Sequence, residues 1–211
     1  RFVPSLPEVV ETVATLRAAS DVVVVADRGR VLNGELLQLK EDLAEAGSRP
    51  VTYLLYDVEG RAEEADGAPF GALDVVWRFD ADLAVRGVYP AIDPVYSVSS
   101  LIEGEQLEAT HLSLAGRGRR LLRRYRELRQ GVAQRGLDRY PPDVRAAYGR
   151  GERLEAFMTQ PFFVAEPYTK RPGAVVPVQE TLAGARRILD GEADGVPIDS
   201  LRWLGQLPDR L

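Results

Sequence analysis

Val22-Val23-Val24-Val25-Ala26 is an unbroken apolar run, mostly of β-branched residues, that follows Asp21. β-Branched side chains favour strands, and a continuous apolar run is typical of a strand that is buried on both faces of a parallel sheet. Val51-Thr52-Tyr53-Leu54-Leu55-Tyr56 has the same character. Both runs predict buried strands, so the N-terminal part of the chain is expected to have an α/β fold.

The segment between the two strands has a helical pattern. Leucines recur at helical spacing after Asn33 or Gly34, either of which can begin a helix, and Gly47 can end it. The leucines of this face are Leu36, Leu37, Leu39 and Leu43. A strand, a helix and another strand at this spacing predict a right-handed crossover unit with a short parallel sheet. A further helix is expected over residues 7–19, before the first strand.

Downstream of the second strand the pattern changes. Residues 73–79 predict a third strand and residues 82–86 a short helix or turn, while from Leu107 onward the pattern is helical. The helices predicted there cover residues 113–134, 142–148, 152–158, 178–189 and 199–204. We therefore predict an α/β part over residues 1–100 and an all-α C-terminal domain over residues 101–211.

Composition excludes several classes of function. The chain has 211 residues, a net charge of −5, no cysteine and one histidine, His111. Thiolate metal sites and cysteine catalysis are therefore excluded, a histidine-rich metal site is not expected, and the net charge argues against nucleic acid as a partner. The sequence shows no signal peptide and no long apolar run, which predicts a soluble, cytoplasmic protein.

Two stretches place aromatic residues beside prolines: Arg86 to Pro94 reads RGVYPAIDP, and Thr159 to Tyr168 reads TQPFFVAEPY. Proline fixes φ and cannot continue a helix or a central strand, so both stretches are expected to be rigid connections. A rigid loop that carries an aromatic ring suits stacking on a flat ligand. The alternative is that these aromatic residues are packing residues under loops.

These two stretches resemble the adenine-pocket segments of the catalytic (beta) subunit of F-type ATP synthases. Further similar segments, at residues 119–129, 176–181 and 188–194, follow in the same order and spacing. The resemblance implies that the adenine-contacting residues are Tyr89, Phe162, Ala165 and Tyr168, with Tyr168 standing where the family usually has phenylalanine. A pocket that relies on stacking alone is expected to bind ATP or ADP weakly, with a dissociation constant on the order of millimolar.

The parts of the family that handle phosphate are not matched. No G-x-x-x-x-G-K-[ST] occurs in the sequence, and Arg28, beside Asp27, stands where the resemblance would place the glutamate that activates water. The resemblance also implies that the middle of the nucleotide-binding domain, with its magnesium-associated aspartate, is omitted between Gly47 and Val51. We therefore expect a truncated, degenerate paralogue with no catalytic residues, no metal site and no required cofactor.

The long helix predicted over residues 113–134 is rich in arginine, which leaves a phosphate or nucleic-acid surface open as one interpretation. The other is a solvated helix face that turns Leu121, Leu122, Tyr125, Leu128 and Val132 to the core. Residues 138–144, DRYPPDV, stand where the family has the acidic DELSEED segment that contacts the rotating central stalk. Torque coupling through this segment is therefore not expected.

The resemblance implies a non-catalytic accessory or assembly partner of ATP-synthase-like alpha or central-stalk subunits, or a protein that self-associates. Such a protein would be peripheral to the membrane through its complex. One alternative is a genuine ATP synthase component whose site is completed by another chain. A second alternative is a free-standing adenylate-binding module.

Overall fold

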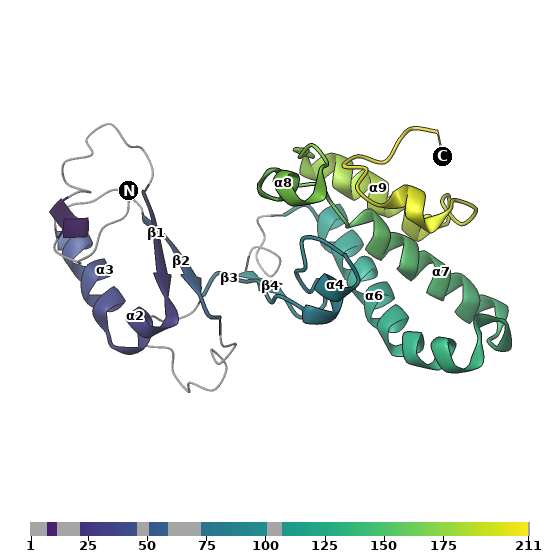
Figure 1. Ribbon diagram of the computed structural model, residues 1–211, viewed down its shortest axis with the longest axis horizontal. Helices are drawn as coiled ribbons and strands as arrows, with labels where there is room; N and C mark the ends of the chain where they lie inside the picture. The colour runs from purple at the N-terminus through teal and green to yellow at the C-terminus, as the bar shows by residue number, and fades with distance from the viewer. Residues whose placement is uncertain (1–7, 12–21, 46–50, 59–72, 101–106, 211) are drawn as a thin grey trace. The chain divides into compact units, whose positions relative to one another are not determined.

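The structure is a computed structural model, and it describes residues 8–11, 22–45, 51–58, 73–100 and 107–210 (Figure 1). The chain divides into two units, residues 1–73 and residues 74–211. Each unit has its own buried cluster, so each is described by itself. Along the chain, the division falls between Leu73 and Asp74. The domain boundary that we expect near Ser100 stays a prediction.

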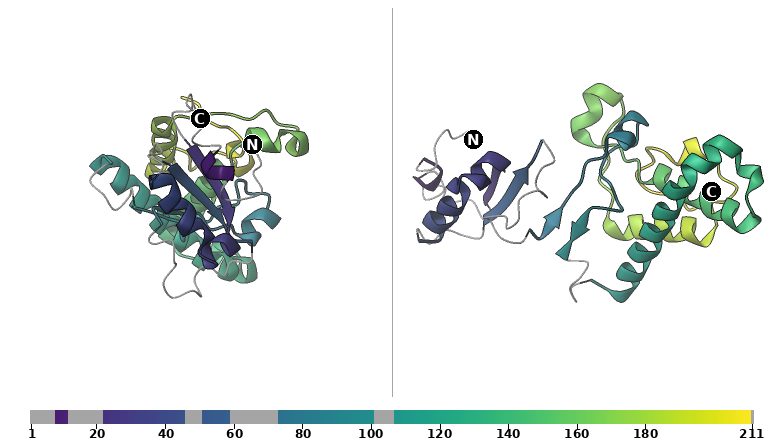
Figure 2. Two further views of the ribbon diagram at one scale, coloured as in Figure 1. Left: turned by 90° about the vertical axis from the view of Figure 1, so that its left-hand side faces the viewer. Right: turned by 90° about the horizontal axis from the view of Figure 1, so that it is seen from below.

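The first unit contains the predicted parallel pair of strands. Strand β1 (Val22–Asp27) pairs in parallel with β2 (Val51–Tyr56), from Val22 opposite Val51 to Asp27 opposite Tyr56. Helix α3 (Glu35–Glu45) connects them and lies alongside the strands (Figures 1 and 2). This arrangement confirms the predicted strand, helix and strand.

Burial in this unit is one-sided. Leu36, Leu39 and Leu43 of α3 are each 1% exposed and pack against the inward-facing side chains of the strands. The opposite face of the sheet is open: Val23 is 59% exposed and Val25 is 61% exposed. The predicted burial of both faces is therefore wrong, because in the described residues α3 covers one face and no layer shields the other. Leu37, which we expected on the buried face of α3, is 38% exposed.

Helix α2 (Arg28–Leu32) stands between β1 and α3 and was not predicted. The Asp27 side chain caps it by accepting a hydrogen bond from the Arg30 amide at 3.1 Å. Helix α3 then begins at Glu35, directly after the two residues that were predicted to begin it. The Asn33 side-chain oxygen accepts from the Glu35 amide at 3.1 Å, and the Gly34 carbonyl accepts from the Gln38 amide at 3.1 Å. Residues 8–11 are helical, and the rest of the helix predicted over residues 7–19 lies outside the described residues.

The second unit begins with a small antiparallel pair, β3 (Val75–Val76) with β4 (Val98–Ser99). An isolated bridge between Phe79 and Ile92 extends the contact between these two parts of the chain. The third strand is therefore much shorter than the predicted residues 73–79. Helix α4 (Ala81–Val85) lies between the two strands along the chain, where a short helix was predicted.

Helices make up most of the second unit, in agreement with the predicted fold class. In the described residues they are, besides α4, α6 (Ala109–Arg135), η1 (Leu137–Arg139), α7 (Pro142–Phe157), η2 (Phe163–Ala165), α8 (Glu166–Thr169), α9 (Val178–Asp190) and η3 (Ile198–Leu201). We predicted two helices where α7 is continuous, and the helix expected over residues 199–204 is instead the short η3.

Helices α6, α7 and α9 enclose the core of this unit. Phe157 and Ile188 are fully buried there, and Leu122, Leu154 and Leu201 are 1–4% exposed. Gly151 lets α6 and α7 approach closely, because a Cβ atom at this position would lie 2.5 Å from the Cβ atom of Tyr125. Among the described residues, no helix combines the length and the apolar character that crossing a membrane requires.

Candidate functional site

The first aromatic–proline stretch is a loop that leaves α4 sharply. Asp80 caps the start of α4 by accepting from the Leu83 amide at 3.1 Å, and Gly87 ends the helix with φ at +69°, a region that favours glycine. Val88 and Ala91 are buried, at 4% and 8% exposed, which seats the loop on the protein. Tyr89 lies between them and is 37% exposed, so its ring is partly accessible.

Asp93 anchors the end of this loop. One of its carboxylate oxygens accepts from the amides of Val95 at 2.7 Å and Tyr96 at 3.1 Å, and the other accepts from Nη1 of Arg126 at 2.6 Å. Asp93 is 5% exposed. Burial alone would raise the pKa of Asp93, but the hydrogen bonds from Arg126 and the two amides outweigh it and hold the pKa below its ordinary value.

Arg86 anchors the start of the loop. Its Nη1 and Nη2 atoms donate to the two carboxylate oxygens of Glu155 at 2.5 and 2.9 Å, and its Nε atom donates to Asp82 at 2.8 Å. Glu155 lies on α7 and is 7% exposed. The hydrogen bonds to Glu155 are the main cause that raises the pKa of Arg86 above its ordinary value, against the opposing effect of burial.

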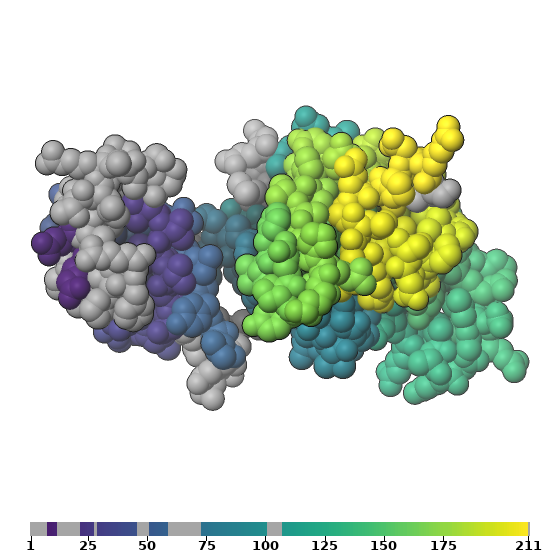
Figure 3. Space-filling model, turned by 45° about the horizontal axis from the view of Figure 1, so that its top comes forward, coloured from purple at the N-terminus to yellow at the C-terminus, as the bar shows by residue number. Residues whose placement is uncertain are grey.

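The second aromatic–proline stretch begins where α7 ends, and it lies beside the first. The Gln160 amide donates to the carbonyl oxygen of Tyr89 at 2.7 Å. The Gln160 side-chain nitrogen donates to the carbonyls of Phe157 at 2.8 Å and Gly205 at 3.1 Å. The Thr159 carbonyl accepts from the Trp203 amide at 2.9 Å, so the C-terminal segment joins the same assembly. In Figure 3 the second stretch is light green and the C-terminal segment is yellow, and their surfaces adjoin.

The four predicted adenine-contacting residues differ in exposure. Phe162 and Ala165 are half-buried, whereas Tyr89 is 37% exposed and Tyr168 is 87% exposed. We expected the Tyr89 ring to contact the ring of Phe162 or Tyr168. Among the described residues, the ring pair in contact is instead Tyr125 with Tyr148, with centroids 5.0 Å apart. The structure therefore joins the two segments through their backbones and not through their rings.

Sequence reasoning missed Trp203 and Arg171, which lie beside these segments. The Arg171 guanidinium stands 5.6 Å from the centroid of the Trp203 ring. Trp203 has a positive φ of 63°, and Lys170, next to Arg171, has 56°. Neither backbone conformation has a signal in the local sequence, because left-handed residues are usually glycine or asparagine.

Asp27 has a structural role in the first unit. Asp27, which lies beside the position of the family's glutamate, is occupied as the cap of α2. Within residues 8–11, 22–45, 51–58, 73–100 and 107–210, no three side chains of the metal-binding types lie close enough to hold a metal ion.

The arginine-rich helix is α6, and several of its arginines bind within the unit. Arg126 and Arg129 donate to Asp93 and Asp82, and Arg117 donates to Asp190 at 2.6 Å. Leu122, Tyr125 and Leu128 are buried, as predicted for the core face of this helix.

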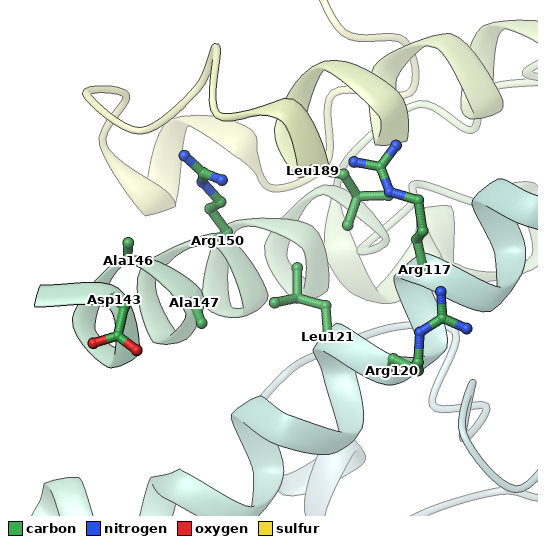
Figure 4. A pocket seen from close by; sticks show the side chains of 8 residues that line it. All are labelled: Arg117, Arg120, Leu121, Asp143, Ala146, Ala147, Arg150 and Leu189. Atoms are coloured by element: carbon green, nitrogen blue, oxygen red, sulfur yellow. The ribbon is translucent and has the colours of Figure 1, made fainter. Parts of the chain in front are cut away.

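A separate pocket of about 550 Å³ lies between α6, α7 and α9. Figure 4 shows the side chains that line it. Arg117 and Arg120 enter it from α6, and Arg150 enters it from α7. Because Arg117 is paired with Asp190 and Arg150 with Asp194, these arginines tie the end of α9 to α6 and α7.

No protein-family model matches the chain. The chain is 33% identical over 181 residues to the ATP synthase subunit beta of Coprothermobacter proteolyticus, a match that covers 84% of this chain and 40% of that protein. The chain thus spans less than half the length of this curated relative, and the resemblance read from the two aromatic–proline stretches is confirmed. Over the part of that protein that it spans, the chain is a relative of ATP synthase beta subunits.

Proposed function

We propose that this chain is a non-catalytic, beta-like protein that assembles with ATP-synthase-like alpha or central-stalk subunits. One observation carries the proposal: the matched region keeps the two adenine-pocket segments side by side, through the hydrogen bond from Gln160 to Tyr89, while the sequence has no phosphate loop. In this proposal the chain contributes a beta-like surface to the complex and no catalytic group of its own. It would stand peripheral to the membrane through its complex.

The adenine site is proposed to be weak and not to require a cofactor. Tyr89, Phe162, Ala165 and Tyr168 would hold the base, and ATP or ADP would bind mainly by stacking. Tyr168 is 87% exposed, so little of its surface is pre-organised around a ligand. Because no phosphate cradle adds charge-assisted hydrogen bonds, a dissociation constant on the order of millimolar is expected.

The test of the proposal is co-expression with an alpha-type subunit and a central-stalk subunit, followed by affinity purification and size-exclusion chromatography. The proposal expects this chain to elute with one of them in a stoichiometric complex. A chain that elutes alone and remains monomeric over a range of concentrations would contradict it. A monomer that nevertheless binds ADP would favour the free-standing adenylate module.

A measurement of ATP hydrolysis distinguishes this proposal from the alternative of a genuine ATP synthase component whose site is completed by another chain. Without a phosphate loop, the purified chain should release no phosphate from Mg-ATP above background. If another chain completes the site, the complex would hydrolyse ATP, and changing Tyr89 to alanine in this chain would lower that activity. Hydrolysis that depends on Tyr89 would therefore replace the non-catalytic proposal with that of a genuine ATP synthase component.

A further inference from the structure

We propose that two buried arginine–carboxylate pairs, Arg86–Glu155 and Arg126–Asp93, are positioning residues that hold the Tyr89 loop against the Gln160 segment. The nucleotide-binding consequence of this inference rests on the proposed function, whereas its structural consequence does not. The two pairs are not indicated by the aromatic–proline motifs, because their partners lie on other helices.

The two ion pairs hold the Tyr89 loop at its two ends. Arg86 precedes Tyr89 by three residues and binds Glu155 on α7, and Asp93 follows Tyr89 by four residues and binds Arg126 on α6. Between these two points, the Tyr89 carbonyl accepts the Gln160 amide at 2.7 Å. The loop is therefore attached to α6, to α7 and to the segment that follows α7.

The geometry of the Arg86–Glu155 pair fixes the orientation of the two side chains as well as the distance between them. Both terminal nitrogens of Arg86 donate to the two oxygens of Glu155, and a two-pronged contact of this kind resists rotation. Glu155 is five residues before Gln160 on the same run of chain. The pair therefore fixes the start of the Tyr89 loop relative to the helix end from which the Gln160 segment departs.

Because these pairs are buried, we expect them to matter more for the position of the Tyr89 loop than for the stability of the protein. Glu155 and Asp93 are 7% and 5% exposed. Taking two opposite charges out of water costs about as much as their attraction returns, so a buried pair often stabilises no better than apolar residues of similar size. The apolar replacement lacks the directional hydrogen bonds. Stability and positioning can therefore be separated by removing both charges together.

The experiment uses the full chain and its variants Arg86→Met, Glu155→Met and the double variant, with amide hydrogen exchange followed by NMR. The reporting amide is Gln160, and the amides of Leu122 and Ile188 in the core of the same unit give the reference for global opening. Each single variant is expected to lower the melting temperature, since it leaves one charge buried without its partner. The double variant is expected to recover much of that loss while Gln160 still exchanges roughly tenfold faster than in the native chain.

Asp82→Asn is the matched control. Asp82 also accepts from Arg86, but its side chain is 57% exposed, so the variant should leave the exchange of Gln160 unchanged. If the double variant protects Gln160 as well as the native chain does, the pair has no positioning role and the inference is overturned. A parallel series, Asp93→Asn and Arg126→Met, tests the other end through the amides of Val95 and Tyr96.

ADP binding links this inference to the proposed adenine site. ADP titrated into the native chain should shift the amide resonances of Tyr89 and Gln160, and the double variant should bind ADP at least roughly tenfold more weakly. A native chain that does not bind ADP would contradict the proposed adenine site, and the exchange of Gln160 would still decide the positioning role. Equal ADP binding by the native chain and by the double variant would contradict the positioning role.

Discussion

Gly151 occupies a point in α7 that no larger residue can fill without movement. An added Cβ atom would lie 2.5 Å from the Cβ atom and 3.0 Å from the Cγ atom of Tyr125, which is itself buried. Both groups belong to the contact between two helices, so neither can move as the end of a flexible side chain would. The close approach of α6 and α7 therefore depends on the missing side chain.

We expect Gly151→Ala to lower the free energy of unfolding by about 1–3 kcal/mol, the usual cost of overpacking a core. The matched control is Gly118→Ala in α6, where the new Cβ atom would make an ordinary contact of 3.7 Å with Leu154. That change should stabilise the protein by roughly 0.5–1 kcal/mol, because alanine loses less backbone entropy than glycine in a helix. Urea unfolding of both variants measures these two changes in stability. A Gly151→Ala variant as stable as the Gly118→Ala variant would contradict the packing argument.

Asp93 gives the protein a predictable response to acid. Its pKa is lower in the folded chain than in the unfolded chain, so the stability that it supplies is fully present above about pH 4–5 and is lost as the pH falls through its folded pKa. We expect Asp93→Asn to lower the free energy of unfolding at pH 7 by roughly 1.5–3 kcal/mol, since Arg126 loses a charged partner.

The difference between the native chain and Asp93→Asn should narrow below about pH 4, where Asp93 is protonated in the unfolded chain before it is protonated in the folded chain. Thermal unfolding from pH 7 to pH 3 measures this convergence. Asp190→Asn is the control, because Asp190 forms an exposed pair with Arg117 and should contribute little at any pH. Curves for the native chain and Asp93→Asn that stay parallel to the lowest pH would show that the carboxylate does not carry this stability.

In helix α3, two leucines only two positions apart differ in burial. Leu39 is 1% exposed and packs against the sheet, while Leu37 is 38% exposed. We expect Leu39→Ala to lower the stability of the first unit by about 2–5 kcal/mol, from lost transfer energy and the cavity left behind. Leu37→Ala should cost less than about 1 kcal/mol.

Hydrogen exchange of the β1 and β2 amides measures both effects. The amide of Ile188, in the second unit, serves as an internal reference that neither variant should change, because the two buried clusters share no residue. Equal effects of Leu37→Ala and Leu39→Ala would contradict the one-sided burial of α3.

Local periodicity was sufficient to predict β1, β2, α3, α6 and α9, because each carries its own apolar pattern. It could not predict the exposure of Val23 and Val25, since a run of valine shows strand propensity but not how many layers cover the strand. It also failed at α7. The two helices predicted over residues 142–148 and 152–158 are one continuous helix, within which Gly151 allows a close contact with Tyr125 from another helix.

Part of the candidate site could likewise be predicted from local sequence, and part of it could not. The motifs at residues 86–94 and 159–168 indicated which segments belong together, and the hydrogen bond from Gln160 to Tyr89 joins them. The Arg86–Glu155 pair joins residues 69 positions apart, and no local pattern announces such a contact. Long-range polar pairs of this kind depend on the packing of whole helices.

The two units have separate cores, which has a consequence for folding. The larger cluster runs from Val95 to Leu207 and lies entirely within residues 74–211. We therefore expect residues 74–211, produced alone, to fold. Their amide resonances for α6, α7 and α9 should match those of the full chain, as two-dimensional NMR can check. A poorly dispersed spectrum of this fragment would show that the first unit is needed for folding.

Helix α6 has 27 residues, so at 1.5 Å per residue it is a rod of about 40 Å. It holds the α9 end through Arg117 and the Tyr89 loop through Arg126, and these two attachment points are nine residues apart. Because the helical backbone fixes the rise per residue, the spacing between these two attachment points is set by α6 itself. The last residue of α9 and the Tyr89 loop are therefore held at a fixed separation along one helix.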